Sequence, residues 1–220
     1  MVKVLAIVAH PDDEVLGAGG ALAKHARLGD DVNVAILGEG SLSRKSGSAK
    51  EASMLQTAGR DAAKALGARS VSFFGLPDNR FDSLARLEIT KKLEPLFEAL
   101  KPDVVYTHHW GDLNVDHRRT LDAVLPLARP FSSSVSRVLC FETLSATEWN
   151  CRNDFSPNYF VKLEQPDFER KLRALKCYKS ELRPFPHPRS PECVEALAKV
   201  RGANCGSALA EAFEAVRLIS

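Results

Sequence analysis

Two short segments of the chain concentrate side chains that can hold a metal ion or move a proton. The first segment, HPDDE at residues 10–14, places one histidine and three acids directly behind an apolar run. The second segment, HHWGDLNVDHR at residues 108–118, adds three histidines and two aspartates. Gly, Asn or Ser would suffice to build a simple turn, so this density of charge behind apolar segments indicates chemistry.

The residue types predict a metal centre with a base beside it. Two histidines from separate segments and one carboxylate form a ligand set that suits Zn²⁺ with a position left open for water. Zinc lowers the pKa of that water to about 7, which makes it a nucleophile at neutral pH. A second carboxylate could accept the proton and return it to the leaving group. Asp12 and Asp13 could fill both roles, and residue types alone leave open which of them binds the metal.

The same acids also have a structural interpretation. Asp12, Asp13 and Glu14 could cap a following helix and interact favourably with its dipole. A single histidine behind a strand is more often a loop or core residue than a ligand. These explanations weaken if both segments lie at one edge of the same sheet, and the predicted elements indicate that they do.

The first two-thirds of the chain alternate between strand and helix patterns. Strands are predicted at 2–9, 31–37, 70–74, 103–108 and 137–142, and helices at 15–28, 48–66, 84–100 and 117–128. This alternation is typical of βαβ units around a mostly parallel sheet. We therefore predict an α/β, doubly wound, Rossmann-like fold with helices on both faces. In the common order 3-2-1-4-5, strands 1 and 4 are neighbours, and such sheets bind ligands at the carboxyl ends of their strands.

The remaining third predicts further elements within the same single domain, 1–220. We expect an edge strand at 160–163, helices at 167–182 and 192–201, a proline-rich loop at 184–191 and a return to the sheet at 210–219. GAGG at 17–20 is no dinucleotide fingerprint, because its glycines fall inside the first helix and an acidic run occupies the turn. These glycines are expected to let that helix pack closely on the sheet.

The bulk composition excludes several classes of protein. The 220 residues carry a net charge of +2, which implies no general attraction to nucleic acid or to a membrane surface. No apolar stretch approaches the roughly 20 residues of a membrane span, and no secretory signal is recognised. The five cysteines are scattered without a CxxC pair, which indicates reduced thiols in a cytoplasmic protein.

Taken together, the motifs resemble the PIG-L/LmbE-like zinc-dependent N-acetylglucosaminyl deacetylases. AHPDDE at 9–14 and GDLNVDHR at 111–118 carry the resemblance, which extends to PDNRFD at 77–82, FETLSATEW at 141–149, YKSELRPFPHPRSPE at 178–192 and RGANCGSALAEAF at 201–213. It implies hydrolysis of an N-acetyl group from an N-acetylglucosamine-type conjugate by a metal-activated water. Zn²⁺ is the implied cofactor, with Fe²⁺, Mn²⁺ or Co²⁺ as substitutes. The resemblance also implies a small amino-sugar conjugate as partner and a homo-oligomer.

The resemblance assigns roles to individual positions. His10, Asp13 and His117 would bind the metal, and Asp12 would be the general base. Many members have HxDH in the second motif, whose first histidine steadies the oxyanion or protonates the leaving amine. That position is Asn114 here, and an amide can donate a hydrogen bond but no proton.

The missing histidine leaves the source of the leaving-group proton open. Asp12 could act as both base and acid, or His108, His109 or His187 could donate the proton. Asp116 is expected to orient a neighbouring side chain without binding the metal.

Several cations are candidates for contacting the substrate. Arg183, His187 and Arg189 lie in the proline-rich segment, which we expect to form a semi-rigid rim over the site. Arg60 and Arg80 are weaker candidates for the same role.

Two other functions remain as alternatives. Two histidines and one carboxylate also describe the metal site of non-haem Fe(II) oxygenases, although those enzymes are usually β-barrels. A catalytically silent sugar-binding protein is the other alternative, but a binding protein has no need of a base beside a metal.

Overall fold

The structure is a computed structural model that describes residues 1–40, 48–151 and 154–220. Its strands are β1 (Lys3–Val8), β2 (Asp31–Gly38), β3 (Ser70–Leu76), β4 (Val104–His108), β5 (Arg137–Phe141), β6 (Tyr159–Lys162) and β7 (Ala210–Leu218). Its helices are α1 (Asp13–Arg27), α2 (Ala49–Leu66), α3 (Arg86–Leu100), α4 (Val115–Val124), α5 (Gln165–Leu175) and α6 (Pro191–Cys205), with short 3₁₀ turns η1 (Phe81–Ser83) and η2 (Thr147–Trp149).

The strands form one sheet in the order β3-β2-β1-β4-β5-β7-β6. Strands β1 to β5 pair in parallel, and β7 runs antiparallel to both β5 and β6. The predicted doubly wound sheet with the order 3-2-1-4-5 is therefore confirmed. The predicted edge strand and the predicted return of the chain to the sheet are also present, as β6 and β7.

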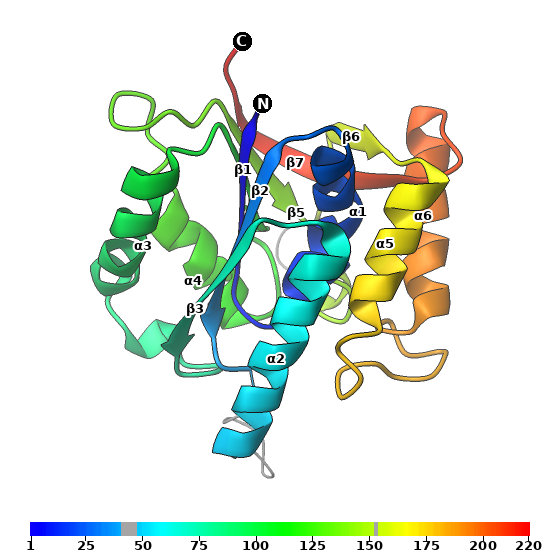
Figure 1. Cartoon of the computed structure of the whole chain (residues 1–220), viewed down its shortest axis with the longest axis horizontal. Coiled ribbons are helices and arrows are strands. Elements are labelled where there is room, and N and C mark those ends of the chain that lie inside the picture. The colour runs from blue at the N-terminus through cyan, green and yellow to red at the C-terminus, as the bar shows by residue number, and fades with distance from the viewer. Residues whose placement is uncertain (41–47, 152–153) are drawn as a thin grey trace.

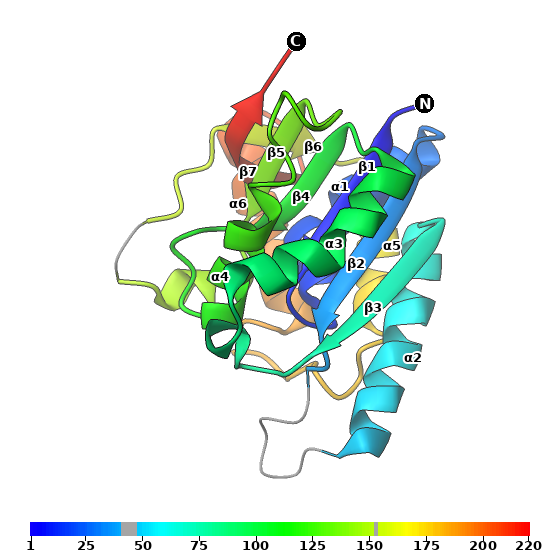
Figure 2. The same ribbon diagram turned by 90° about the vertical axis from the view of Figure 1, so that its left-hand side faces the viewer.

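Helices cover both faces of this sheet, as Figures 1 and 2 show. Helices α1, α2, α5 and α6 lie on one face, and α3 and α4 lie on the other, in front of the sheet in Figure 2. Strand β1 supplies alternate residues to the two cores, with Val8 on the α1 face and Ile7 on the opposite face. Because both faces are covered, central strands are apolar throughout rather than alternating.

Helix α1 packs against the sheet without a side chain at Gly17. A Cβ atom added there would lie 2.1 Å from Cδ2 of Phe141 on β5. The expectation that the GAGG glycines allow close packing is confirmed at this position.

Several predicted boundaries differ from the structure. The helix predicted at 167–182 ends at Leu175. Tyr178 follows in a turn, where its backbone N–H donates to the Leu175 carbonyl. The side chain of Tyr178 is buried and donates its hydroxyl hydrogen to Glu14, and this tertiary contact outweighs the local helical pattern. Helix α6 runs on to Cys205, where Gly206 ends it at φ 67°. Helix α4 begins earlier than predicted, because Asn114 caps it, and it ends earlier, because Pro126 has no backbone N–H with which to continue the helix.

In the described ranges, no helix is both long enough and apolar enough to cross a membrane.

Candidate active site and metal centre

The segments after β1 and β4 meet at the carboxyl edge of the sheet. β1 and β4 are parallel neighbours with Val4 opposite Val104. Short connections, 9–12 and 109–114, lead from these strands into α1 and α4. Asp13 is the first residue of α1. Asn114 caps α4, where its Oδ1 accepts from the Asp116 N–H at 2.8 Å. The first turns of the two helices and the connection that precedes α1 therefore bring the acidic and histidine side chains together.

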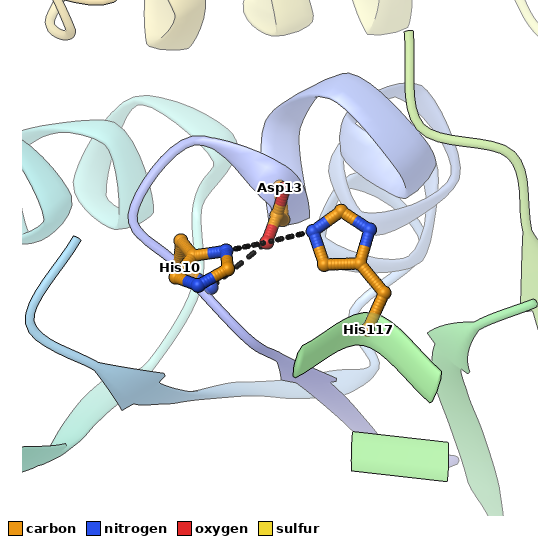
Figure 3. Close-up of side chains that lie close together, drawn as sticks. All are labelled: His10, Asp13 and His117. Carbon is orange, nitrogen blue, oxygen red and sulfur yellow. Dashed lines mark hydrogen bonds and ion pairs between the residues drawn. The ribbon is translucent and has the colours of Figure 1, made fainter. Parts of the chain in front are cut away.

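Three of these side chains form a cluster that fits a metal ion. The Asp13 Oδ2 atom lies 3.4 Å from Nδ1 of His10 and 3.4 Å from Nε2 of His117 (Figure 3). One ligand atom from each residue lies within 4.8 Å of the others. The Asp13 Oδ1 atom is buried and has no hydrogen-bond partner among the described residues. Two imidazole nitrogens and a carboxylate with an unsatisfied oxygen suit a divalent cation.

Each candidate histidine ligand has a second carboxylate on its other ring nitrogen. His10 Nε2 lies 2.9 Å from Asp116 Oδ2, and His117 Nδ1 lies 3.1 Å from Asp112 Oδ1. Such pairs fix the ring orientation and the tautomer of a metal-binding histidine and make it a better ligand. Asp116 is thus placed to orient His10.

The two orienting carboxylates are themselves held in place. Asp116 accepts the backbone N–H groups of Asn79 at 2.7 Å and Phe81 at 2.9 Å. Asp112 accepts the Thr147 hydroxyl at 2.6 Å. Because its oxygens are occupied by backbone amides, Asp116 is better suited to hold His10 than to bind a second cation with it.

Charge within the cluster shifts the pKa values strongly. Burial acts to raise the pKa of Asp13, but His117, His108 and a hydrogen bond with His10 outweigh it, so this pKa lies well below its usual value. Burial acts to lower the pKa of His10, and the bonds to Asp116 and Asp13 overcome it and raise the pKa to about 10. The carboxylates around His117 likewise overcome burial and raise its pKa to about 9. In the absence of a metal ion, protons on His10 and His117 balance the negative charge of the surrounding carboxylates.

Asp12 lies beside the cluster and is not used as a helix cap. It occupies the N-cap position of α1 with φ 105°, yet its side chain makes no capping hydrogen bond, which argues against the structural interpretation. Only 2% of the residue is exposed. Burial is the main cause that raises its pKa, Arg189 opposes this, and Asp13 and Glu181 add to it, so that the pKa is about 7. A carboxylate with that pKa is suited to general base catalysis.

The backbone of Asp12 is held in its left-handed conformation by a buried acid. The Asp12 N–H donates to Glu14 Oε2 at 3.2 Å, and Tyr178 donates to the other oxygen of Glu14. Burial raises the pKa of Glu14 to about 8, although the bond from Tyr178 opposes it. Neither this support for Asp12 nor the role of Asp112 was predicted from the sequence, because Glu14 and Asp112 are held in place by Tyr178 and Thr147, which lie far away in the chain.

Arg189 is the one cation of the proline-rich segment that reaches Asp12 in the described contacts. Its Nη1 atom lies 3.0 Å from Asp12 Oδ2 and 3.2 Å from Glu181 Oε2, and its Nε donates to Ser145 Oγ at 2.7 Å. The proline-rich segment therefore contacts Asp12 through Arg189. His187 is exposed and accepts the Arg189 N–H through Nδ1.

The structure does not bring the other candidate arginines into the cluster. Arg183 is exposed and donates to the backbone carbonyls of Ser180 and Leu182. Arg60 lies on α2 with its guanidinium 5.0 Å from the centre of the Phe73 ring. Arg80 is exposed and precedes η1, next in the chain to the amides that hold Asp116.

The two adjacent histidines at the end of β4 have different surroundings. His108 Nε2 accepts the Ala9 N–H at 2.9 Å, and its ring stacks on His117 at 3.9 Å. Burial and the neighbouring His117 lower the pKa of His108 to about 4, so it is neutral. His109 turns to Glu214, 3.2 Å away, on the antiparallel side of the sheet.

Comparison with known proteins identifies the family. Residues 5–128 match the PIG-L family, which is described as GlcNAc-PI de-N-acetylase. The chain belongs to the PIG-L family. The matched region contains both segments of the cluster, so the resemblance drawn from the motifs is confirmed.

Individual relatives extend the comparison over most of the chain. The uncharacterized deacetylase YaiS of Escherichia coli K12 is 29% identical over 185 residues, which are 80% of this chain and 90% of that protein. The N,N'-diacetylchitobiose deacetylase of Pyrococcus horikoshii is 23% identical with a TM-score of 0.78, over 98% of this chain and 84% of that one.

A solved structure with a different activity has the same fold. GalB of Pseudomonas putida KT2440, a 4-carboxy-2-hydroxymuconate hydratase, is 22% identical with a TM-score of 0.81 and covers 100% of this chain and 98% of that one. At such identities the likeness shows the fold alone. The open sheet and the PIG-L match favour a deacetylase over the oxygenase alternative, whose usual scaffold is a β-barrel.

Proposed function

We propose that the protein is a metal-dependent N-deacetylase that hydrolyses the N-acetyl group of an N-acetylglucosamine-type conjugate. The observation that carries this proposal is the position of Asp12, a buried carboxylate with a pKa of about 7 that adjoins a cluster of two histidines and one aspartate. Membership of a de-N-acetylase family supports the reaction class. The donor set fits Zn²⁺, and Fe²⁺, Mn²⁺ or Co²⁺ could take its place.

In this proposal His10, Asp13 and His117 hold the cation. A divalent ion there would lower the pKa of a water molecule and polarise the acyl carbonyl. Asp12 accepts a proton from that water as the new carbon–oxygen bond forms, and gives the proton to the nitrogen as the carbon–nitrogen bond breaks. The products are a free amine, which carries the proton taken from water, and acetic acid, which ionises to acetate at neutral pH.

The neighbouring polar groups support a dual role for Asp12. His108 uses Nε2 as an acceptor for a backbone N–H, and His109 faces Glu214. His187 is exposed on the proline-rich loop. Asn114 uses its Oδ1 as the cap of α4, which leaves its Nδ2 to donate a hydrogen bond to an oxyanion. Asp12 is then the group best placed to carry the proton in both directions.

The test is acetate release from a panel of N-acetylated glucosamine conjugates by the purified protein. We expect chelation to abolish release and added Zn²⁺ to restore it. A metal-loaded protein that releases no acetate from any conjugate would contradict the proposal and point to another reaction of activated water. Substrate contacts by Arg80, Arg183 and His187 are tested in the same assay, because loss of a contact raises KM with kcat unchanged. A substrate contact by Arg189 would add a rise in KM to any effect through Asp12, which it also contacts.

A further inference from the structure

A hollow of about 330 Å³ lies at the end of α1 remote from the candidate active site. We name it the α1–β6 hollow. Its walls are the last turns of α1 and the edge strand β6, which lie side by side in Figure 1. The Lys24 ammonium donates a hydrogen bond to the Lys162 carbonyl oxygen at 2.8 Å and so joins the two walls. Asp13 is at the opposite end of the same 15-residue helix, about 22 Å away at 1.5 Å per residue.

The hollow is positively charged. Lys24, Arg137 and Lys162 line it, and no lining residue from the described ranges is an aspartate or a glutamate. Arg137 is half-buried at the start of β5, and its guanidinium makes no hydrogen bond or ion pair with any residue that the structure describes. A guanidinium in this position favours a planar or tetrahedral acid, which it can bind through two parallel hydrogen bonds.

Two polar residues that line the hollow, His25 and Tyr106, are hydrogen-bonded to each other, and His25 is also hydrogen-bonded to Asp30. His25 Nδ1 lies 2.7 Å from Asp30 Oδ2, and His25 Nε2 lies 3.1 Å from the Tyr106 hydroxyl. The other Asp30 oxygen accepts the Val2 N–H at 2.8 Å. Both oxygens of Asp30 are thus occupied, and Asp30 does not line the hollow, whereas Lys24, Arg137 and Lys162 do.

Apolar side chains line the rest of the hollow. Leu28 comes from the end of α1, and Tyr159, Phe160 and Val161 come from β6. Leu28 is 61% exposed, which leaves a large aliphatic surface for a ligand to cover. A volume near the lower end of the range for ligand pockets fits one ring and one acid group.

We propose that the α1–β6 hollow binds a small organic anion that joins a planar ring to a single carboxylate or phosphate group. Arg137 binds the acid, Lys24 and Lys162 add positive charge at the rim, and the ring lies against Leu28 and Tyr159. This site is separate from the candidate active site and does not depend on the proposed deacetylation.

Calorimetric titration with four probes tests the proposal. Phenyl phosphate and benzoate present a ring with each kind of acid, inorganic phosphate lacks the ring, and benzyl alcohol lacks the charge. We expect saturable binding of at least one ring-bearing acid and weaker binding of both incomplete probes. Equal binding of inorganic phosphate, or no saturable binding of either ring-bearing acid, would overturn the proposal.

Variants locate the binding. Arg137→Gln should weaken binding of the ring-bearing acid about tenfold or more, the loss expected for a charge-assisted hydrogen bond. Lys24→Gln is a second variant in case the first does not fold. Lys92→Gln, an exposed position on α3, is the matched control. Binding that survives Arg137→Gln and Lys24→Gln but is lost in His117→Ala would place the anion at the metal cluster and overturn the assignment.

Discussion

Arg189 and Asp12 form the pair of residues on which the pH dependence of the site depends most directly. Their side chains are 3.0 Å apart, and the guanidinium stabilises the ionised carboxylate against the effect of burial. Asp12 must be ionised to accept a proton, so activity should be lost as the pH falls through its pKa of about 7.

Replacing Arg189 should move that loss of activity to higher pH. Arg189→Gln removes the group that lowers the pKa of Asp12, and losing an opposite charge at this distance typically raises a carboxylate pKa by about 1–3 units. The acidic limb of kcat/KM against pH reports the shift. Arg183→Gln is the control from the same loop, and an unmoved limb in Arg189→Gln would contradict the assigned role.

Asp112 provides a second prediction for a single residue. It contacts Nδ1 of His117 while Nε2 of the same ring faces Asp13. Asp112→Asn should therefore weaken metal binding by about 10- to 100-fold, as loss of such a partner does elsewhere. Competition with a zinc indicator measures the affinity, with Asp82→Asn as an exposed control. Unchanged affinity would show that Asp112 does not orient His117.

Helix α1 is the element that connects the fold to the site. Its first residue is Asp13, and its glycine face lies against β5 at Phe141. A side chain at Gly17 would push the helix off the sheet and move Asp13 with it.

Gly17→Ala should consequently destabilise the protein by about 1–3 kcal/mol, the usual cost of overpacking. Gly19→Ala is the matched control on the same helix, because the nearest atom to its new Cβ, Lys171 Cγ, is 3.1 Å away, against 2.1 Å at Gly17. Urea unfolding measures the free energy of unfolding of both variants. Equal free energies of unfolding for the two variants would contradict the close packing at Phe141.

Helices and strands could be predicted from the sequence where the local pattern of apolar residues favours the same structure as the packing of the whole fold. The alternating apolar runs predicted β1 to β5 and their order, and therefore the meeting of His10 with His117. The end of α5 was not predictable, because Tyr178 is drawn to a buried Glu14 that lies 164 positions earlier. Arg60 was named for its charge, but a sequence does not reveal that its guanidinium rests on Phe73.

At the scale of the whole molecule, metal binding and protonation compete for one cluster. His10 and His117 have pKa values of about 10 and about 9 without metal, so near neutral pH both rings are protonated and must lose their protons when a cation binds.

Apparent zinc affinity should accordingly rise with pH, by up to about a hundredfold per unit while two protons are displaced. Indicator competition between about pH 6 and 8 measures the slope. The accompanying rise in melting temperature on adding Zn²⁺ should disappear in His117→Ala, because only a ligand that binds the folded state stabilises it. An affinity independent of pH would contradict the assigned ligands.

The central claim is that Asp12 transfers the proton beside a metal held by its neighbours. The most direct test compares acetate release and bound metal in Asp12→Asn and in the parent protein, with Asp122→Asn, a half-buried position on α4, as the control. We expect Asp12→Asn to keep its metal and to lose about 10²- to 10⁴-fold in kcat, the usual contribution of a general base. Undiminished acetate release from metal-loaded Asp12→Asn would contradict the claim.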